Sequence, residues 1–120
     1  MILDSNIIIL AALPAHADLR RWLFTQDCAV SVVSFVEVLG FPAITTEEIG
    51  FFEQFFGLLP LVSVDQTIMR EAAVLRQQRR MSVADAIIAA TALRENRTLA
   101  TRNIADFKWI SGLTLVDPLA

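Results

Sequence analysis

The sequence predicts an α/β fold, a three-layer sandwich with a mostly parallel central sheet, in a single domain of residues 1–120. Short apolar runs rich in β-branched residues alternate along the chain with longer segments of helical periodicity, and strands that alternate with helices pair in parallel through right-handed crossovers. Hydrophobic residues make up 55% and charged residues 19% of the chain, which indicates a densely packed globular core.

The first predicted element is a buried strand. Met1-Ile2-Leu3 and Ile7-Ile8-Ile9-Leu10 flank the polar cluster Asp4-Ser5-Asn6, and continuous apolar runs of this kind predict a strand buried on both faces, with Asp4 at its carboxyl end. A helix is predicted over 18–24 and a second strand over 29–33. Ser34-Phe35-Val36-Glu37 then predicts a capping box with its acid three residues after the cap.

Further elements follow in the same alternation. A helix is predicted from Thr45 or Thr46 to Phe56, ended by Gly57, and a strand over 58–64 in which Pro60 indicates a less central position. Asp65 starts the next helix, with Ile68, Met69, Ala72, Ala73 and Leu75 facing inward and Arg70, Arg76, Arg79 and Arg80 facing outward. Strands are predicted over 98–101 and 113–116. We interpret Arg76, Arg79 and Arg80 as a solvated helix end, with contact to an anionic partner, either a nucleic acid or an acidic segment, as the alternative.

The helix predicted over 82–93 carries an acid to the interior edge of the fold. Ser82 and Asp85 have the spacing of a capping box, and four alanines among the next residues let the helix pack closely. A carboxylate costs several kcal/mol to desolvate unless something pairs with it. The sequence should therefore supply a partner for Asp85.

Four acids occupy equivalent places in this architecture, because the carboxyl ends of parallel strands meet at one crevice. They are Asp4, Glu37, Asp85 and Asp106, and Ser5, Asn6, Thr101 and Asn103 should line the same crevice. Taken singly, each acid also fits an ordinary helix start, where the dipole contributes roughly 0.3–1 kcal/mol. Clustered, they would repel one another unless they bind a cation or hold protons. Their oxygen ligands suit Mg²⁺ or Mn²⁺, whereas His16 and Cys28 are too isolated to make a zinc site.

Charge and cysteine usage restrict the other classes of protein. The net charge of −3 argues against a protein that coats nucleic acid by bulk electrostatics, but it allows a local basic strip. The single Cys28 cannot form an internal disulfide, which fits a reducing compartment. The apolar segment from Met1 to Ala15 is interrupted by Asp4 and lacks a basic leader. We expect a cytoplasmic protein with no membrane segment.

The motifs resemble those of the PIN domain, and more closely those of VapC-type toxins of prokaryotic toxin–antitoxin pairs. The resemblance rests on Asp4-Ser5-Asn6, on Glu37 after Ser-Phe-Val, on residues 82–93 and on residues 99–107, in this order along nearly the whole chain. It implies a metal-dependent endoribonuclease that uses Mg²⁺ or Mn²⁺ to activate water against an RNA phosphodiester. The acidic set would be Asp4, Glu37, Asp85 and Asp106. Ser5 replaces the more usual threonine and keeps a hydroxyl.

The resemblance also implies partners, namely an RNA substrate, a cognate antitoxin, a homodimer and a toxin–antitoxin hetero-oligomer. Arg102, Arg97 and Lys108 are candidate phosphate contacts, with solvated surface charge as the alternative for each. The four phenylalanines among residues 51–56 cover more than one helix face. They predict a contact with the antitoxin or a second copy, and the alternative is that they belong to the core.

Other functions fit the residues less well. A PIN-like module that binds RNA or protein without cutting is one alternative. A phosphoacceptor receiver domain needs adjacent acids after the first strand and a lysine after the fifth, whereas Ser5 follows Asp4 and no lysine follows Val116. A haloacid-dehalogenase-like phosphatase needs Asp-x-Asp where this chain has Asp4-Ser5-Asn6.

Overall fold

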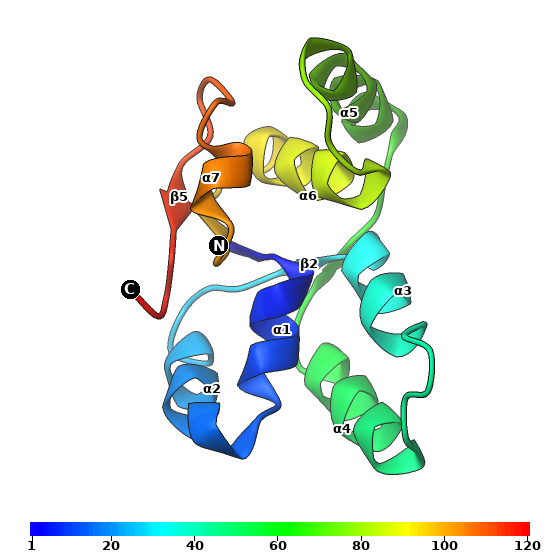
Figure 1. The fold of residues 1–120 in the computed structure, drawn as a ribbon, viewed down its shortest axis with the longest axis vertical. Coiled ribbons are helices and arrows are strands. Elements are labelled where there is room, and N and C mark those ends of the chain that lie inside the picture. Colours follow the sequence, from blue (N-terminus) through cyan, green and yellow to red (C-terminus); the bar gives the residue numbers. More distant parts are fainter.

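The computed structural model describes residues 1–120 and has helices on both faces of a central sheet (Figure 1). The strands are β1 Ile2–Leu3, β2 Val30–Ser31, β3 Leu61–Val62, β4 Leu99–Ala100 and β5 Leu115–Val116. The helices are α1 Ser5–Ala11, α2 Ala17–Leu23, α3 Val32–Leu39, α4 Thr46–Gly57, α5 Gln66–Gln78, α6 Val83–Arg94 and α7 Ile104–Phe107, with a 3₁₀ turn at Pro14–His16. The predicted α/β class is confirmed. No helix is long and apolar enough to cross a membrane.

Every strand pair in the sheet is parallel. One part has the order β1-β4-β5 and the other pairs β2 with β3. A parallel bridge between Ile2 and Ala29 joins the two parts, so the strands follow the order β3-β2-β1-β4-β5. The strand after Pro60 therefore lies at an edge, as predicted. Because all strands point the same way, the residues that follow β1 and β4 emerge at the same end of the sheet.

Alternate residues of the strands face opposite layers. Ile2 and Leu99 lie in a core cluster with residues of α5 and α6, while Leu3 and Ala100 lie in a second cluster with residues of α1, α2 and α4. All four side chains are fully buried. Figure 1 shows α5 and α6 on one side of β1 and β2, and α1, α2 and α4 on the other. The predicted three layers, with strands buried on both faces, are confirmed.

Asp4 lies at the carboxyl end of the first strand, as predicted, whereas the apolar run from Ile7 to Leu10 is helical. Only Ile2 and Leu3 form β1, and α1 begins directly after Asp4, whose extended backbone caps the helix. Ile7, Ile8 and Ala11 are buried on one face of α1. Isoleucine loses only a few tenths of a kcal/mol in a helix relative to the best helix formers, and burial of two isoleucines outweighs that cost.

The prediction that Ser34 caps α3 is wrong. The second strand ends at Ser31 rather than Val33, and Ser31 is the residue whose hydroxyl caps the helix, accepting a hydrogen bond from the amide of Val33 at 3.1 Å. Ser34 is a fully buried residue within the first turn. Glu37 therefore lies in the second turn of α3, one turn beyond Ser34 on the same face.

The helices α4 and α5 begin where the sequence predicts. Thr45 and Glu48 form a reciprocal capping box at the start of α4, and the Asp65 carboxylate accepts a hydrogen bond from the amide of Ile68 at the start of α5. The inward face of α5 is narrower than predicted, because Met69 is 54% exposed and Ala73 is also exposed. The buried residues that remain, Ile68, Ala72 and Leu75, have the spacing of a single helix face.

The aromatic run of α4 belongs mainly to the core. Phe52, Phe55 and Phe56 are buried and Phe51 is half-buried, and their rings pack against one another and against Phe35. The alternative that these rings belong to the core therefore holds for three of the four, and Phe51 stays partly exposed.

Candidate active site

Asp4 is a buried acid held in place by the strand beside it. It follows β1, is only 3% exposed, and accepts a hydrogen bond at Oδ2 from the hydroxyl of Thr101, 2.7 Å away. Thr101 follows the neighbouring strand β4 and is fully buried. The amide of Asn103 donates in turn to the Thr101 hydroxyl at 2.9 Å. Two adjacent parallel strands thus fix the orientation of one carboxylate.

The environment of Asp4 disfavours its charge. Burial raises the pKa of the Asp4 carboxyl above its ordinary value, and the hydrogen bonds from Thr101 and from the backbone of Ser5 only partly offset this. The negative charges of Glu37 and Asp106 raise the pKa further. Three of the predicted acids are therefore near enough to influence one another.

Glu37 joins the site through a pair of serines. The Ser5 hydroxyl lies 2.7 Å from Oε1 of Glu37 and 3.1 Å from the hydroxyl of Ser34. Ser5 and Ser34 are both buried, whereas Glu37 is exposed. The contact joins α1 to α3 directly beside Asp4. Ser34 was predicted as a helix cap, so this role was missed; its spacing of three residues from Glu37 is the signal that places both on one helix face.

Asp85 is the acid at the start of α6. The backbone amide of Asp85 donates a hydrogen bond to the hydroxyl of Ser82 at 3.0 Å, which confirms Ser82 as the cap. Burial raises the pKa of the Asp85 carboxyl, followed by the charge of Asp4, while a hydrogen bond with the Ser82 side chain lowers it. Glu37 and Asp106 raise it as well. The charges of the three other predicted acids therefore all act on the pKa of Asp85.

The outer edge of the cluster is open to solvent. Asp106 is an exposed residue of α7, and Asn6 and Asn103 are exposed at the starts of α1 and α7. A cavity of about 210 Å³ adjoins the acids and is lined by Arg79, Arg80, Met81, Asp85 and Asp106. The site therefore has a buried end at Asp4 and an accessible end at Asp106.

The acids lack a counterion within the chain. The three ion pairs of the structure join Arg21 to Asp18, Arg97 to Asp27 and Arg102 to Asp117. None involves the four clustered acids. No three acidic, histidine or cysteine side chains converge as a finished metal cage. Carboxylate and hydroxyl oxygens that take part in no ion pair fit a hard divalent ion whose remaining ligands come from water or substrate.

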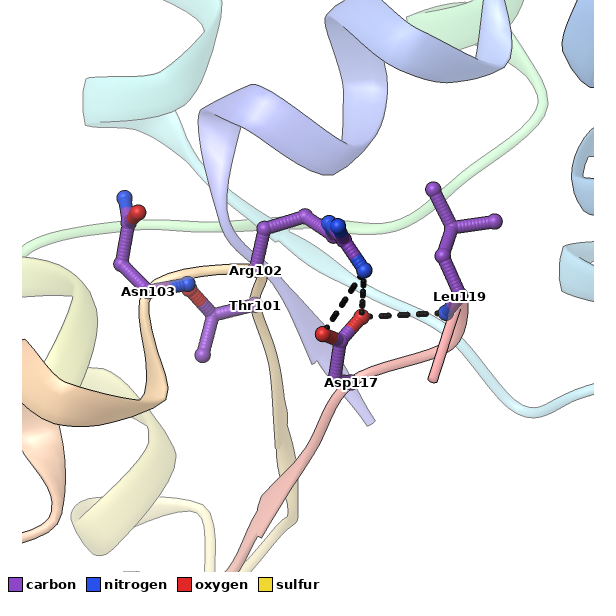
Figure 2. A network of polar contacts seen from close by, with 5 residues as sticks. All are labelled: Thr101, Arg102, Asn103, Asp117 and Leu119. Atoms are coloured by element: carbon purple, nitrogen blue, oxygen red, sulfur yellow. Dashed lines mark hydrogen bonds and ion pairs between the residues drawn. The ribbon is translucent and has the colours of Figure 1, made fainter.

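Two of the three predicted phosphate contacts are engaged elsewhere. Figure 2 shows Arg102 beside Asp117. Nη1 of Arg102 lies 3.1 Å from Oδ1 and 2.9 Å from Oδ2 of Asp117. Asp117 also accepts from the amide of Leu119, so this carboxylate ties Arg102 to the segment after β5. Arg97 precedes β4 and therefore lies at the opposite end of the sheet from Asp4. Of the three residues, only Lys108 is exposed and takes part in no ion pair, so it stays a candidate phosphate contact.

Comparisons with known proteins agree with this architecture. Residues 1–111 match the family described as PIN domain. A toxin–antitoxin complex from Klebsiella pneumoniae is 27% identical, with 98% of this chain and 96% of that chain covered and a TM-score of 0.80. VapBC2 from Rickettsia felis, bound to a promoter DNA fragment, is 22% identical, with 96% of each chain covered and a TM-score of 0.80.

VapBC-1 from nontypeable Haemophilus influenzae is similarly related. It is 21% identical, with 99% of this chain and 98% of that chain covered and a TM-score of 0.80. No curated protein sequence matches the chain. The match over most of the sequence, together with the parallel sheet and its acidic crevice, shows that this chain belongs to the PIN domain family.

Proposed function

We propose that this protein is a Mg²⁺- or Mn²⁺-dependent endoribonuclease and the toxin of a cytoplasmic toxin–antitoxin pair. The observation that carries the nuclease proposal is the cluster of Asp4, Glu37, Asp85 and Asp106 at the carboxyl ends of the strands, with no cationic side chain paired to it. Membership of the PIN family and the likeness to toxin–antitoxin complexes support the same reading.

Divalent ions held by such carboxylates neutralise phosphate charge and make water a stronger nucleophile at neutral pH. The protein's own residues supply the geometry. Thr101 orients Asp4 from the adjacent strand, and Ser5 orients Glu37 from α1. Asp85 and Asp106 stand at the open end, where RNA has access. Ligands fixed at the end of a buried strand and on packed helices favour precise positioning of a reacting phosphate.

The raised pKa values of Asp4 and Asp85 make ion binding a competition with protons. A carboxylate must be deprotonated to bind a divalent ion, so affinity should fall as the pH drops toward these raised pKa values.

The direct test is cleavage of a panel of structured RNAs by antitoxin-free protein, with Mg²⁺ or Mn²⁺ and with EDTA. We expect metal-dependent cleavage that is lost in folded Asp4→Asn and Asp85→Asn variants. If folded, partner-free wild-type protein cuts no RNA with either ion, the nuclease proposal fails. The chain would then be a PIN-like module that binds RNA or protein without cutting it.

An apolar groove is the proposed docking site for the antitoxin. It lies between α1, the segment after α3 and α4, encloses about 150 Å³, and eight of its nine lining residues are hydrophobic. The residues are Ile9, Ala12, Leu13, Val38, Phe41, Ile44, Glu48, Phe51 and Phe52. An amphipathic helix would bury its apolar face there. The toxin–antitoxin assemblies among similar structures support an antitoxin as the occupant. We also propose a homodimer within that assembly.

Phe41→Asp tests the groove, because this side chain is 61% exposed and its loss should leave the core intact. We expect loss of co-purification with the co-expressed antitoxin. Leu58→Asp is the matched control, since Leu58 is 68% exposed and lies outside the groove. Equal loss in both variants, or retention in both, would contradict the assignment. The native mass of the antitoxin-free protein tests the homodimer separately.

A further inference from the structure

A basic turn lies beside the acidic cluster. α5 ends at Gln78 and α6 begins after Ser82, and the turn between them contains Arg79 and Arg80. Both arginines line the cavity of about 210 Å³ that Asp85 and Asp106 also line. Cationic and acidic side chains therefore border one small space at the open end of the site.

Arg79 is held in place by an aromatic ring. Its guanidinium carbon lies 5.8 Å from the centroid of the Trp109 ring, within the range of a cation–π contact. The indole Nε1 of Trp109 donates to the carbonyl of Asp106 at 2.9 Å. Arg79 is thus positioned relative to the α7 backbone that carries Asp106.

The turn itself is also fixed. Nε of Arg76 donates to the carbonyl of Met81 at 3.1 Å, which closes the turn over one helix end. Neither Arg79 nor Arg80 belongs to an ion pair, and no hydrogen bond occupies either guanidinium group. Their donors are therefore free for a ligand, whereas those of Arg102 and Arg97 are used within the chain.

We propose that Arg79 and Arg80 bind a backbone phosphate of the RNA in this cavity and thereby position the strand against Asp85 and Asp106. The inference rests on the proposed nuclease function. A guanidinium group presents a planar set of donors that matches phosphate oxygens, and the positive end of the α6 dipole lies at the same place.

RNA fits this cavity better than an acidic peptide segment does. The cavity is shared with two of the acids at which cleavage is proposed, so the substrate backbone has to pass through it. Contacts that grip phosphates without reading bases position a strand independently of its sequence. Arg79 and Arg80 are exposed, as predicted for a solvated helix end, and they also line a cavity with Asp106 of α7.

The test measures binding without catalysis. In an Asp4→Asn background with EDTA, the affinity for a short single-stranded RNA is measured at several salt concentrations. Each of Arg79→Gln and Arg80→Gln should reduce the magnitude of the slope of log affinity against log salt concentration by about 0.7. If the affinities at 1 M salt are equal, the variant's affinity for RNA at 0.1 M salt is then about fivefold lower than that of the parent. Arg80→Lys should restore most of the slope. Arg70→Gln, an exposed arginine of α5 outside the cavity, is the matched control.

Three outcomes would overturn the inference: unchanged RNA binding in both glutamine variants, an equal loss in Arg70→Gln, or a loss of binding to a polyglutamate peptide but not to RNA. Thermal melts establish that each variant is folded. Cleavage by the wild-type protein with Mg²⁺ is scored separately. Active wild type with unaffected arginine variants refutes this inference alone, whereas inactive wild type refutes the proposed function.

Discussion

The two ends of the parallel sheet differ in how their charges are compensated. At the amino ends of the strands, Arg97 donates to the carbonyl of Asp27 at 2.6 Å and lies 3.3 Å from its carboxylate. At the carboxyl ends, Asp4 and Asp85 have no cationic partner, and their pKa values are raised. At the amino end Arg97 and Asp27 form an ion pair, whereas at the carboxyl end Asp4 and Asp85 form none.

The size of the hollow does not distinguish the ends in the same way. The amino end has a hollow of about 570 Å³ that includes Arg97 and Asp27, while the cavity beside Asp85 has about 210 Å³. The larger hollow has its charges paired and the smaller one does not. Charge that the chain leaves unpaired is therefore the better guide to chemistry here than volume.

The largest expected difference between the ends is in catalysis. Asp85→Asn should reduce metal-dependent RNA cleavage by about 100-fold or more, beyond the typical cost of losing a ligand's supporting hydrogen bond. Asp27→Asn at the amino ends should retain wild-type cleavage. The measurement is the initial cleavage rate at saturating Mg²⁺. Comparable losses in the two variants would remove the distinction between the ends.

The next difference is in the pH dependence of stability. A raised pKa of Asp4 and Asp85 means that the folded state holds their protons more tightly than the unfolded state does. The contribution of these two groups to the unfolding free energy should therefore be most favourable below the ordinary aspartate pKa, near about pH 4, and should decline as the pH rises through the raised values. Asp85→Asn should flatten this decline, and Asp27→Asn should not.

Mg²⁺ should reverse that decline. At about 100 times its dissociation constant, an ion that binds only the folded state adds about 2.7 kcal/mol to the unfolding free energy. The gain should appear near neutral pH and vanish where Asp4 and Asp85 are protonated. Thermal melts across pH, with Mg²⁺ and with EDTA, measure it. An equal gain in the Asp4→Asn, Asp85→Asn double variant would place the ion elsewhere.

A smaller effect is expected from the residue that orients Asp4. Thr101→Val removes the hydroxyl 2.7 Å from Oδ2 of Asp4 and should weaken metal affinity 10- to 100-fold, as is typical of about one lost supporting hydrogen bond. Thr101→Ser keeps the hydroxyl and should stay near wild type. Mg²⁺ titration of the melting temperature separates lost affinity from misfolding. Identical titrations for the valine and serine variants would contradict the role.

The smallest effect is expected at the amino ends. Arg97→Gln removes the ion pair with the exposed carboxylate of Asp27 and should lower the unfolding free energy by about 1 kcal/mol or less. RNA affinity and cleavage should not change, because Arg97 lies at the opposite end of the sheet from Asp4. Chemical denaturation and RNA titration check both statements. Weaker RNA binding by Arg97→Gln would contradict this prediction and would support Arg97 as a phosphate contact.

Much of the fold and the acidic set could be predicted from the sequence because the signals are local. A cap and its helix lie within a few residues of one another, so Ser82, Asp65 and Thr45 were found where the structure has them. The parallel order then implies that the residues after β1 and β4 meet. Asp4 and Thr101 meet in this way across 97 positions of sequence.

Other features depended on partners that the sequence does not place. Ile7 to Leu10 is helical because burial against the second core outweighs a weak strand preference. Ser34 lies inside α3 because Ser31, three residues earlier, caps the helix. The Ser34 hydroxyl accepts a hydrogen bond from Ser5 of α1 instead.

The fate of each arginine was likewise decided in three dimensions. Arg102 is neutralised by Asp117 and Arg97 by Asp27, while Arg79 and Arg80 remain unpaired beside Asp85. Local pattern determined which residues carry charge and where helices start. Only tertiary packing determined which charges are paired, because pairing depends on segments that approach from distant parts of the chain and on the direction in which each strand ends.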